Sequence, residues 1–472
     1  MLISIFKSGI FQWQYRRQLL VSLSEMMMSC ADLNVLVATL ITFCHGIALG
    51  WLSPMLPKLL SPQETPLSFY IDVNEASWLG AVISIGGISG NFSFSYLMNR
   101  FGRKVSIYAL AVPHTSIEWL YVARVFAGLT GGGMFVVLPI FIGEIADNSI
   151  RGRLCSFFTL TMNTGIMVGF VVSSHIAYHV IPCAVVGLPV LYVLLATRYP
   201  EPPQQLIRWK REEEAEKSLR YYRRCDGPNV SKEEERAYQK HFDEMRLAIQ
   251  QQNNDTDDNG LSMSDFLTKR SLKALATGLV LMVANIFTGT FAFNNYMSNI
   301  FDAVHTQLDP NTNTIIIGAV QILGTLASIY LVDRYGRKIL LIVSCAGSGI
   351  GTSAFGLYAF YAEEQKVDLS AFSAWLPVTL MAFIIFIANV GVISVTMVVL
   401  VEILPQKIRA VATSFCLGCL SFFAFASLKT FPLMMFHLGL AATMWFCAAV
   451  SVICLFYVVV CLEETKGRSM YD

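Results

Sequence analysis

The sequence predicts an all-α membrane protein built from two related halves, and three observations support this fold class. Hydrophobic residues make up 54% of the chain and charged residues only 14%, and the mean hydropathy of +0.54 lies far from that of a typical soluble domain. Uncharged stretches of about 20 residues, the length that crosses the hydrocarbon core, recur along the chain. Charged motifs stand between these stretches in the same order in both halves.

Eleven stretches are long and apolar enough to cross a bilayer. Backbone amides find no water in lipid, so each stretch must satisfy its own amides, and an α-helix does this within one segment. An all-helical bundle is therefore expected. The stretches are residues 33–54, 77–98, 119–143, 155–175, 177–197, 274–301, 312–332, 339–362, 371–401, 410–428 and 438–462.

One long hydrophilic loop divides the chain near its middle. Residues 198–273 hold 30 of the 67 charged residues, mixed in sign at helical spacing, which predicts short surface helices. We therefore expect an N-terminal tail without a cleavable signal, a first membrane half, the loop, a second membrane half and a C-terminal tail. Their boundaries are 1–32, 33–197, 198–273, 274–462 and 463–472.

Lysine and arginine in the short loops predict the orientation. They flank the apolar stretches on one side, while the loops on the other side carry mainly acidic residues. The positive-inside rule places the basic loops, the long loop and both termini in the cytoplasm. The basic positions include Arg16, Arg103, Arg151, Arg337, Lys407 and Arg468.

The third span is expected to be short. Lys104 and Glu144 both lie on the cytoplasmic side by this topology, so the chain must cross twice within 39 residues, of which residues 119–143 use 25. The remaining 14 residues reach about 21 Å as a helix, less than the hydrocarbon thickness of about 30 Å. A truncated isoform, a gene-model error and a genuine loss all remain open.

Two charged motifs are repeated between the halves. Asn99-Arg-Phe-Gly-Arg-Lys104 returns as Asp333-Arg-Tyr-Gly-Arg-Lys338, and the stretch from Glu144 to Arg151 returns as the stretch from Glu402 to Arg409. The chain therefore looks duplicated.

These motifs resemble those of the sugar porters of the major facilitator superfamily. Pro139-Ile-Phe-Ile-Gly-Glu144, Pro200-Glu-Pro-Pro203 and Glu464-Thr-Lys-Gly467 extend the resemblance from about residue 40 to the end of the chain. Lys429-Thr-Phe431 is similar to insect facilitated trehalose transporters within that family. The resemblance implies the major facilitator fold, with twelve spans in two six-helix halves, a solute site at mid-membrane and alternating access.

The charged motifs are candidates for a cytoplasmic gate. Pairs between the halves would form only when the inner ends close, and a network of such pairs biases a two-state equilibrium. The alternative is that these charges only set the topology. The candidate gate residues are Arg100, Arg103, Glu144, Arg151, Asp333, Arg334, Arg337, Glu402 and Arg409.

Polar residues inside the spans are candidates for the solute site, because amides and hydroxyls pair with sugar hydroxyls. The chain departs from the family pattern here. Thr159 and Asn285 stand where the family has glutamine, and residues 393–397 lack the family's prolines and tryptophan. Helix packing is the alternative role for each residue. We select Thr159, Asn285, Thr288, Asn294, Asn295, Gln321, Asn389 and Thr396, beside which Asn163 and Ser394 are also polar.

Passive transport is favoured over proton coupling, because residues 33–54 contain no acid and His45 is their one titratable imidazole. We expect a facilitative carrier of trehalose or a hexose in the plasma membrane. A non-transporting solute sensor and a carrier of another small polar solute are the alternatives. We find no catalytic, cofactor or metal motif, so an enzyme is not expected. The net charge of +1 indicates no nucleic-acid partner, and the oligomeric state stays open.

Overall fold

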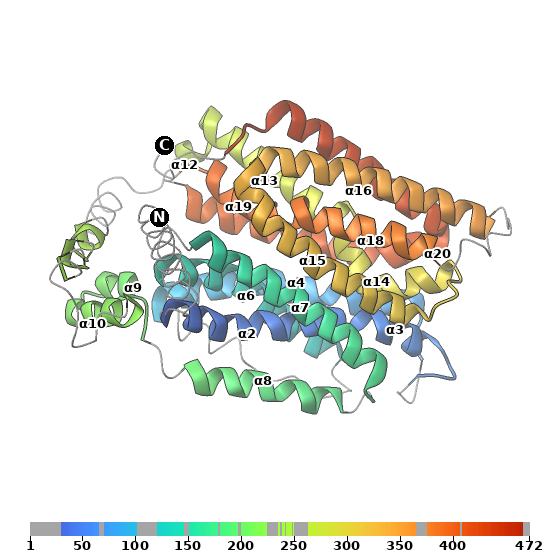
Figure 1. Ribbon diagram of the computed structural model, residues 1–472, viewed down its shortest axis with the longest axis horizontal. Helices are drawn as coiled ribbons and strands as arrows, with labels where there is room; N and C mark the ends of the chain where they lie inside the picture. The colour runs from blue at the N-terminus through green and yellow to red at the C-terminus, as the bar shows by residue number, and fades with distance from the viewer. Residues whose placement is uncertain are drawn as a thin grey trace, which may run out of the picture.

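The structure is a helical bundle in which all regular elements of the described residues are helices. It is a computed structural model (Figure 1). It describes residues 30–65, 70–101, 120–145, 151–177, 180–196, 200–223, 235–236, 238–240, 242–247, 249, 263–364, 375–405 and 408–465. The predicted short third span, residues 105–118, lies outside the described residues.

Among the residues that the structure describes, the first half contributes six helices, drawn in blue to green in Figure 1. Apolar sequence forms them because helices satisfy their own backbone amides. The first predicted span continues past its expected end as a second short helix, and the last of the six has only 16 residues. The helices are α2 (Cys30–Gly50), α3 (Leu52–Leu60), α4 (Val73–Phe101), α6 (Leu120–Ile145), α7 (Arg151–His175) and α8 (Ile181–Ala196).

The second half is more broken along the chain. Its elements are α13 (Lys269–Phe287), α14 (Thr290–Ala303), α15 (Pro310–Tyr335), α16 (Arg337–Ala359), the π-helical turn η2 (Phe360–Glu364), α18 (Leu376–Ala388), the π-helical turn η3 (Asn389–Ile393), α19 (Ser394–Ile403) and α20 (Arg409–Cys461). Gly289, with φ +99°, separates α13 from α14, so the predicted span 274–301 is two helices. Such a left-handed backbone favours glycine.

The two last predicted spans are continuous in α20, which reverses at Gly439. That residue has φ +83°. Arg409 at one end of α20 bonds the carbonyl of Leu404, and beyond the other end Thr465 donates to the carboxylate of Glu402, two residues before Leu404. Both ends of α20 therefore reach the same side of the bundle.

Eight helical stretches among the described residues are long and apolar enough to cross a membrane. The 53-residue α20 counts once among them, whereas α4 and α8 do not meet the criteria of length and hydropathy. The multi-span character is confirmed, and the count of twelve spans stays a prediction.

The long loop forms a small helical unit at one end of the bundle, which we call the loop end. It includes α9 (Pro203–Arg208) and α10 (Glu212–Arg223), whereas α12 (Met263–Phe266), at the end of the loop, lies apart from them against α13 of the second half (Figure 1). A small apolar cluster joins Leu206 and Leu219 to Tyr238, and burial raises the pKa of Tyr238 to about 12. The Tyr221 hydroxyl lies 3.3 Å from Asn34 Nδ2 on α2. The expected surface helices are present.

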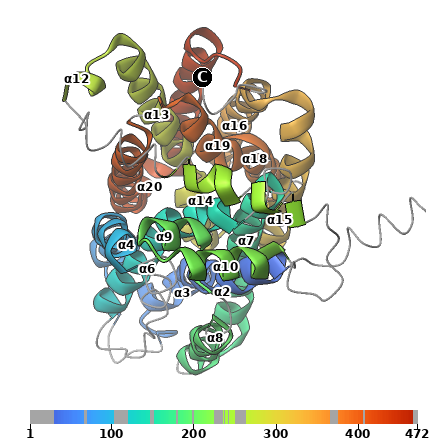
Figure 2. The same ribbon diagram turned by 90° about the vertical axis from the view of Figure 1, so that its left-hand side faces the viewer.

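The halves meet mainly along three helix pairs. α4 packs along α20, α7 packs along α15, and α3 packs against α14. Figure 2, a view from the loop end, shows the first two pairs on opposite sides of the bundle. The end that carries α3 and α14 is called the far end below (Figure 1).

Candidate substrate site

A buried cluster of polar side chains joins the two halves inside the bundle. Asn163 on α7 donates from Nδ2 to Thr325 Oγ1 at 2.7 Å and to Asn389 Oδ1 at 3.1 Å. Gln321 on α15 donates from Nε2 to Asn163 Oδ1 at 2.9 Å. All four side chains are buried. One residue from the first half thus bonds three from the second.

The amide cluster has the donor and acceptor chemistry that a sugar hydroxyl requires. Gln321 Oε1 has no hydrogen-bond partner among the described residues. An unpaired buried acceptor costs free energy, so this oxygen is a natural place for a ligand hydroxyl. The Asn389 side chain also donates to the carbonyl of Ile385 at 2.8 Å, which fixes its orientation.

The helix after the Gly289 break presents further acceptors. On α14, Thr290 Oγ1, Asn294 Oδ1 and Asn295 Oδ1 are buried and have no hydrogen-bond partner in the described part of the chain. Asn295 Nδ2 donates to the carbonyl of Phe291 at 2.9 Å, so its oxygen is free to accept from another group. Buried acceptors without partners are rare in proteins, and three on adjacent turns indicate a polar surface.

Aromatic side chains lie on the same helix. Tyr296 stacks on Phe431 of α20, with ring centroids 5.7 Å apart and planes 7° apart, and its hydroxyl donates to the carbonyl of Leu428 at 2.7 Å. Phe293 meets Phe431 edge-on at 5.8 Å. Phe291 is partly buried beside them. These rings pack against one another, and α14 is thereby anchored to the second half.

The π-helical turn η3 leads directly into residues 393–397, the segment that lacks the family's prolines and tryptophan, most of which belongs to α19. Asn285 Nδ2 on α13 donates to the carbonyl of Val392 at 3.1 Å, and Ser328 Oγ on α15 donates to that of Val390 at 2.9 Å. Thr396 also bonds the Val392 carbonyl, at 2.6 Å. Single π-turns often mark functional sites because they alter the backbone ladder. Here side chains from two neighbouring helices hold the altered carbonyls.

Six of the eight selected residues therefore fall into three groups. Gln321 and Asn389 join the amide cluster, Asn294 and Asn295 line α14, and Asn285 and Thr396 hold η3. Thr288 bonds the carbonyl of Ala284 in its own helix. Thr159 is half-buried on α7, one turn before Asn163, and makes none of the described contacts of the cluster.

Two members of the amide cluster were not selected from the sequence. Asn163 was considered as a polar residue of its span, and the structure places it, rather than Thr159, against α15. Thr325 was missed. Its one sequence signal is its spacing of four residues from Gln321, which puts both on the same helix face.

Arg124 has a structural role in the first half. It is 4% exposed, and it donates from Nε to the carbonyl of Leu79 at 3.2 Å and from Nη1 to that of Ala48 at 2.6 Å. These bonds tie α6 to α4 and α2. His45 Nδ1 lies 3.1 Å from the carbonyl of Ala127, so the same three-helix region holds both side chains.

The charged motifs of the second half form a network at the loop end. Arg337 Nη2 lies 3.2 Å from Glu402 Oε1, and Thr465 Oγ1 donates to Glu402 Oε2. The carboxylate of Glu464 accepts from the backbone amides of Arg337 at 2.9 Å and Lys338 at 3.1 Å. An anion there is favoured by the helix dipole at the start of α16. These contacts lie within the second half.

The structure describes only some of the other predicted gate residues. Arg103 lies outside the described residues, as do the side chains of Arg100, Arg151 and Asp333. Glu144 is buried at the end of α6. Arg334 is exposed, and its guanidinium lies 5.6 Å from the ring centroid of Tyr335. Arg409 Nε donates to the carbonyl of Leu404 at 3.1 Å. The expected pairing between halves stays a prediction.

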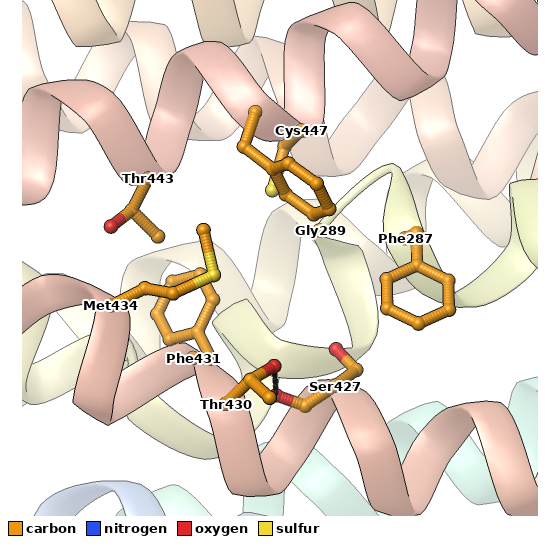
Figure 3. A pocket seen from close by; sticks show the side chains of 9 residues that line it. Phe287, Gly289, Ser427, Thr430, Phe431, Met434, Thr443 and Cys447 are labelled. Carbon is orange, nitrogen blue, oxygen red and sulfur yellow. Dashed lines mark hydrogen bonds between the residues drawn. The ribbon is translucent and has the colours of Figure 1, made fainter. Parts of the chain in front are cut away.

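A separate pocket lies behind the Gly289 break, between α13, α14 and the two arms of α20 (Figure 3). Phe287, Phe431 and Phe446 are among its lining residues. Its threonines bond carbonyls of their own helix, Thr430 to Ala426 and Thr443 to Gly439, both at 2.8 Å. The pocket is therefore apolar and does not contain the selected polar residues.

Comparison with known proteins gives matches along nearly the whole chain. The family described as "Sugar (and other) transporter" matches residues 35–472. The facilitated trehalose transporter Tret1 of Bombyx mori is 31% identical over 426 residues, which are 87% of this chain and 81% of that protein. Tret1 of Drosophila yakuba is 30% identical over 456 residues, and the chain spans about half of its length, 51%.

Solved structures of transporters share the fold. The xylose transporter XylE of E. coli, in a partially occluded inward-open conformation, superposes with a TM-score of 0.71 at 21% identity, covering 92% of this chain and 98% of that one. XylE bound to 6-bromo-6-deoxy-D-glucose superposes equally well, with a TM-score of 0.71 at 20% identity, covering 93% and 97%. At these identities the likeness concerns the fold alone.

Proposed function

The chain belongs to the family of sugar and other transporters, and from this premise we propose that it is a facilitative carrier of trehalose or a hexose that works by alternating access. The bundle and its transporter neighbours establish a multi-pass membrane protein of the major facilitator fold. Trehalose is the cargo named for the relatives at about 30% identity. The solute, the coupling and the direction of transport are parts of the proposal.

The amide cluster between the halves is the observation that carries the proposal. Asn163, Gln321 and Asn389 converge from three helices of both halves, so a solute bound to them would contact both halves at once. Carriers of this kind place the solute at the repeat interface. The free oxygens of Asn294 and Asn295 would extend the site along α14.

Passive transport follows from the first span. Residues 33–54 contain no aspartate or glutamate, and His45 is held against the Ala127 carbonyl. A carrier that moves protons needs a titratable group in the membrane that changes partners during the cycle. We therefore expect uptake that runs to equal concentrations and does not change with external pH.

The orientation belongs to the same proposal. We place the loop end in the cytoplasm because the basic short loops lie there, and we place the far end outside the cell. The plasma membrane is the expected location. Under this orientation Glu64, Asp72 and Glu75 face outward.

Uptake of labelled trehalose and glucose tests the proposal. Cells that express the chain, with surface delivery checked by biotinylation, should show saturable uptake that equilibrates and is unchanged by a proton uncoupler. A second chain with about ten apolar residues inserted after Thr115 restores the expected length of the third span. Flux only from the second chain would assign the first to a truncated form.

Binding without flux would overturn the carrier assignment. If both chains reach the surface and neither moves trehalose or glucose, binding of each sugar to purified protein separates the alternatives. Binding then supports a solute sensor, whereas no binding points to another small polar solute.

A further inference from the structure

One lysine connects the two halves at the far end of the bundle. Lys429 lies on α20, and its Nζ is 2.7 Å from Asn74 Oδ1 and 2.7 Å from Ser77 Oγ, both on α4. The same ammonium lies 4.3 Å from the ring centroid of Trp78. Three consecutive contacts along the first turns of α4 thus surround one charge from the other half.

The contacts use the whole bonding capacity of the ammonium. A lysine has three N–H donors and no acceptor, and here it faces two oxygens and one aromatic ring, whose face attracts cations. The Ser77 hydroxyl donates to the carbonyl of Asn74 at 2.6 Å, so its oxygen is oriented to accept from Lys429. Of the three partners Ser77 is buried, whereas Asn74 and Trp78 are exposed, so the ammonium lies at the rim of the interface between the halves.

The start of α4 is held in place for this role. Asp72 Oδ1 accepts from the backbone amide of Glu75 at 2.6 Å, and Glu75 Oε2 accepts from that of Asp72 at 3.0 Å. This reciprocal capping box fixes the first turn of the helix. Both carboxylates also contribute negative charge on the side of the interface opposite Lys429.

We propose that Lys429 is a latch that holds the halves together at the far end and so favours the state closed there. The inference rests on the proposed alternating-access function. The halves must separate at this end when it opens, and the three contacts then break together. Ser53 on α3, buried completely, accepts from the amide of Ser298 on α14 at 3.0 Å at the same end, so the far end is closed in this structure.

A lysine suits a reversible latch. Its ammonium can reach water along a flexible stem when the end opens, so the open state leaves no charge stranded in lipid. The latch therefore biases the equilibrium without locking it. The latch favours the closed state by the difference between two free energies, that of the three contacts and that of hydrating the freed ammonium.

Ser53→Cys supplies a reporter of closure that needs no transported solute. The purified protein in detergent is treated with a soluble maleimide, and labelling at position 53 is read by intact mass against the same chain without Ser53→Cys. In this background Lys429→Met should speed labelling about tenfold, within the usual range of coupling between sites. Lys429→Arg, which keeps the cation, should speed it less.

Lys58→Met is the matched control. Lys58 also lies near the far end of a span, but its Nζ donates to the carbonyl of Ser173 at 3.2 Å, and both helices, α3 and α7, belong to the first half. Its loss should leave labelling of Ser53→Cys unchanged. Lys429→Asn combined with Asn74→Lys moves the ammonium to the other side of the interface and should slow labelling again.

The latch is overturned if Lys429→Met labels no faster than its parent, or if Lys58→Met speeds labelling as much. A faster rate in Lys429→Met that the exchanged pair does not reverse would also overturn it, since the effect would then be general loosening. Because no sugar enters the assay, a positive result with no uptake of trehalose or glucose would retain the latch and reject the proposed cargo.

Discussion

The two ends of the bundle hold their charged and polar residues in different ways. At the far end Lys429, Tyr296 and Ser298 come from the second half, and each has a partner or close neighbour in the first half. At the loop end the contacts of Arg337 and Glu402 stay within the second half. Between the two ends Asn91 on α4 also donates to the carbonyl of Leu417 on α20 at 3.1 Å. At the terminal turns, however, the described polar contacts that join the halves lie at the far end.

This difference indicates which contacts must change during transport. Contacts across the interface break when that end opens, whereas contacts within one half travel with it as a rigid body. The network of Glu402 and Glu464 accordingly serves to keep α16, α19 and the C-terminal segment together. Lys429 and its neighbours serve to set how often the far end opens.

Gly80→Ala should produce the largest effect, because it acts on the far end directly. A Cβ at this position of α4 would lie well inside van der Waals contact of Tyr296 Oη and 3.0 Å from its Cζ. Tyr296 cannot yield easily, since it is bonded to Leu428 and stacked on Phe431. Overpacking of about 1–3 kcal/mol should shift the carrier toward the open far end and strongly reduce uptake.

Gly187→Ala gives the matched control for that change. An added Cβ on Gly187 of α8 meets nothing within 4 Å, so uptake and surface delivery should equal those of the parent chain. If Gly80→Ala transported as fast as Gly187→Ala, the role of the contact between Gly80 and Tyr296 in closing the far end would lose its support.

Asn163→Ala should have the next largest effect, because it empties the centre of the amide cluster between the two ends. It removes the partner of Gln321 and Asn389 at once, and a change of about 1.4 kcal/mol is tenfold in an equilibrium constant. We expect the ratio kcat/KM for sugar uptake to fall about tenfold. Thr159→Ala, one turn away, should change it little, and equal losses in both would place the solute elsewhere.

Glu402→Ala should affect stability more than transport. Arg337 and Glu402 are each 17% exposed at the side chain, so removal of the carboxylate leaves Arg337 and the Thr465 hydroxyl poorly partnered. Loss of one partner in such a partly buried group costs about 1–3 kcal/mol. The melting temperature of the purified protein should fall. If labelling of Ser53→Cys changed as well, the loop-end network would not be confined to one half.

The membrane bundle could be predicted from the sequence, but its breaks could not. Uncharged stretches indicate helices because lipid leaves the backbone no other partner. Gly289 lies in such a stretch, and the chain has 32 glycines, so nothing local marks the one whose φ turns positive. Tertiary packing selects the break, here through Phe293, which lies against Gly289.

The candidate site was predictable by residue type and less so by partner. Polar residues in spans face the protein interior because lipid penalises them, and this identified Gln321 and Asn389. Which polar residue on α7 meets them depends on how that helix is rotated, and Asn163 rather than Thr159 faces α15. In the same way, Glu464 belongs to a recognisable motif, yet its contact with Arg337 spans 127 residues and leaves no local pattern.

Lys273→Met should produce the smallest effect, because it removes an exposed ion pair at the loop end instead of a partly buried one. Lys273 Nζ and Glu463 Oε1 lie 2.8 Å apart at the loop end, where they join the start of α13 to the C-terminal segment, but both side chains are 59% exposed. Exposed pairs often contribute nothing measurable, because water screens them and ordering two long side chains costs entropy. Melting temperature, uptake and labelling of Ser53→Cys should all match the parent chain. A clear loss of stability in Lys273→Met, equal to that in Glu402→Ala, would mean that burial does not decide which loop-end charges hold the second half together.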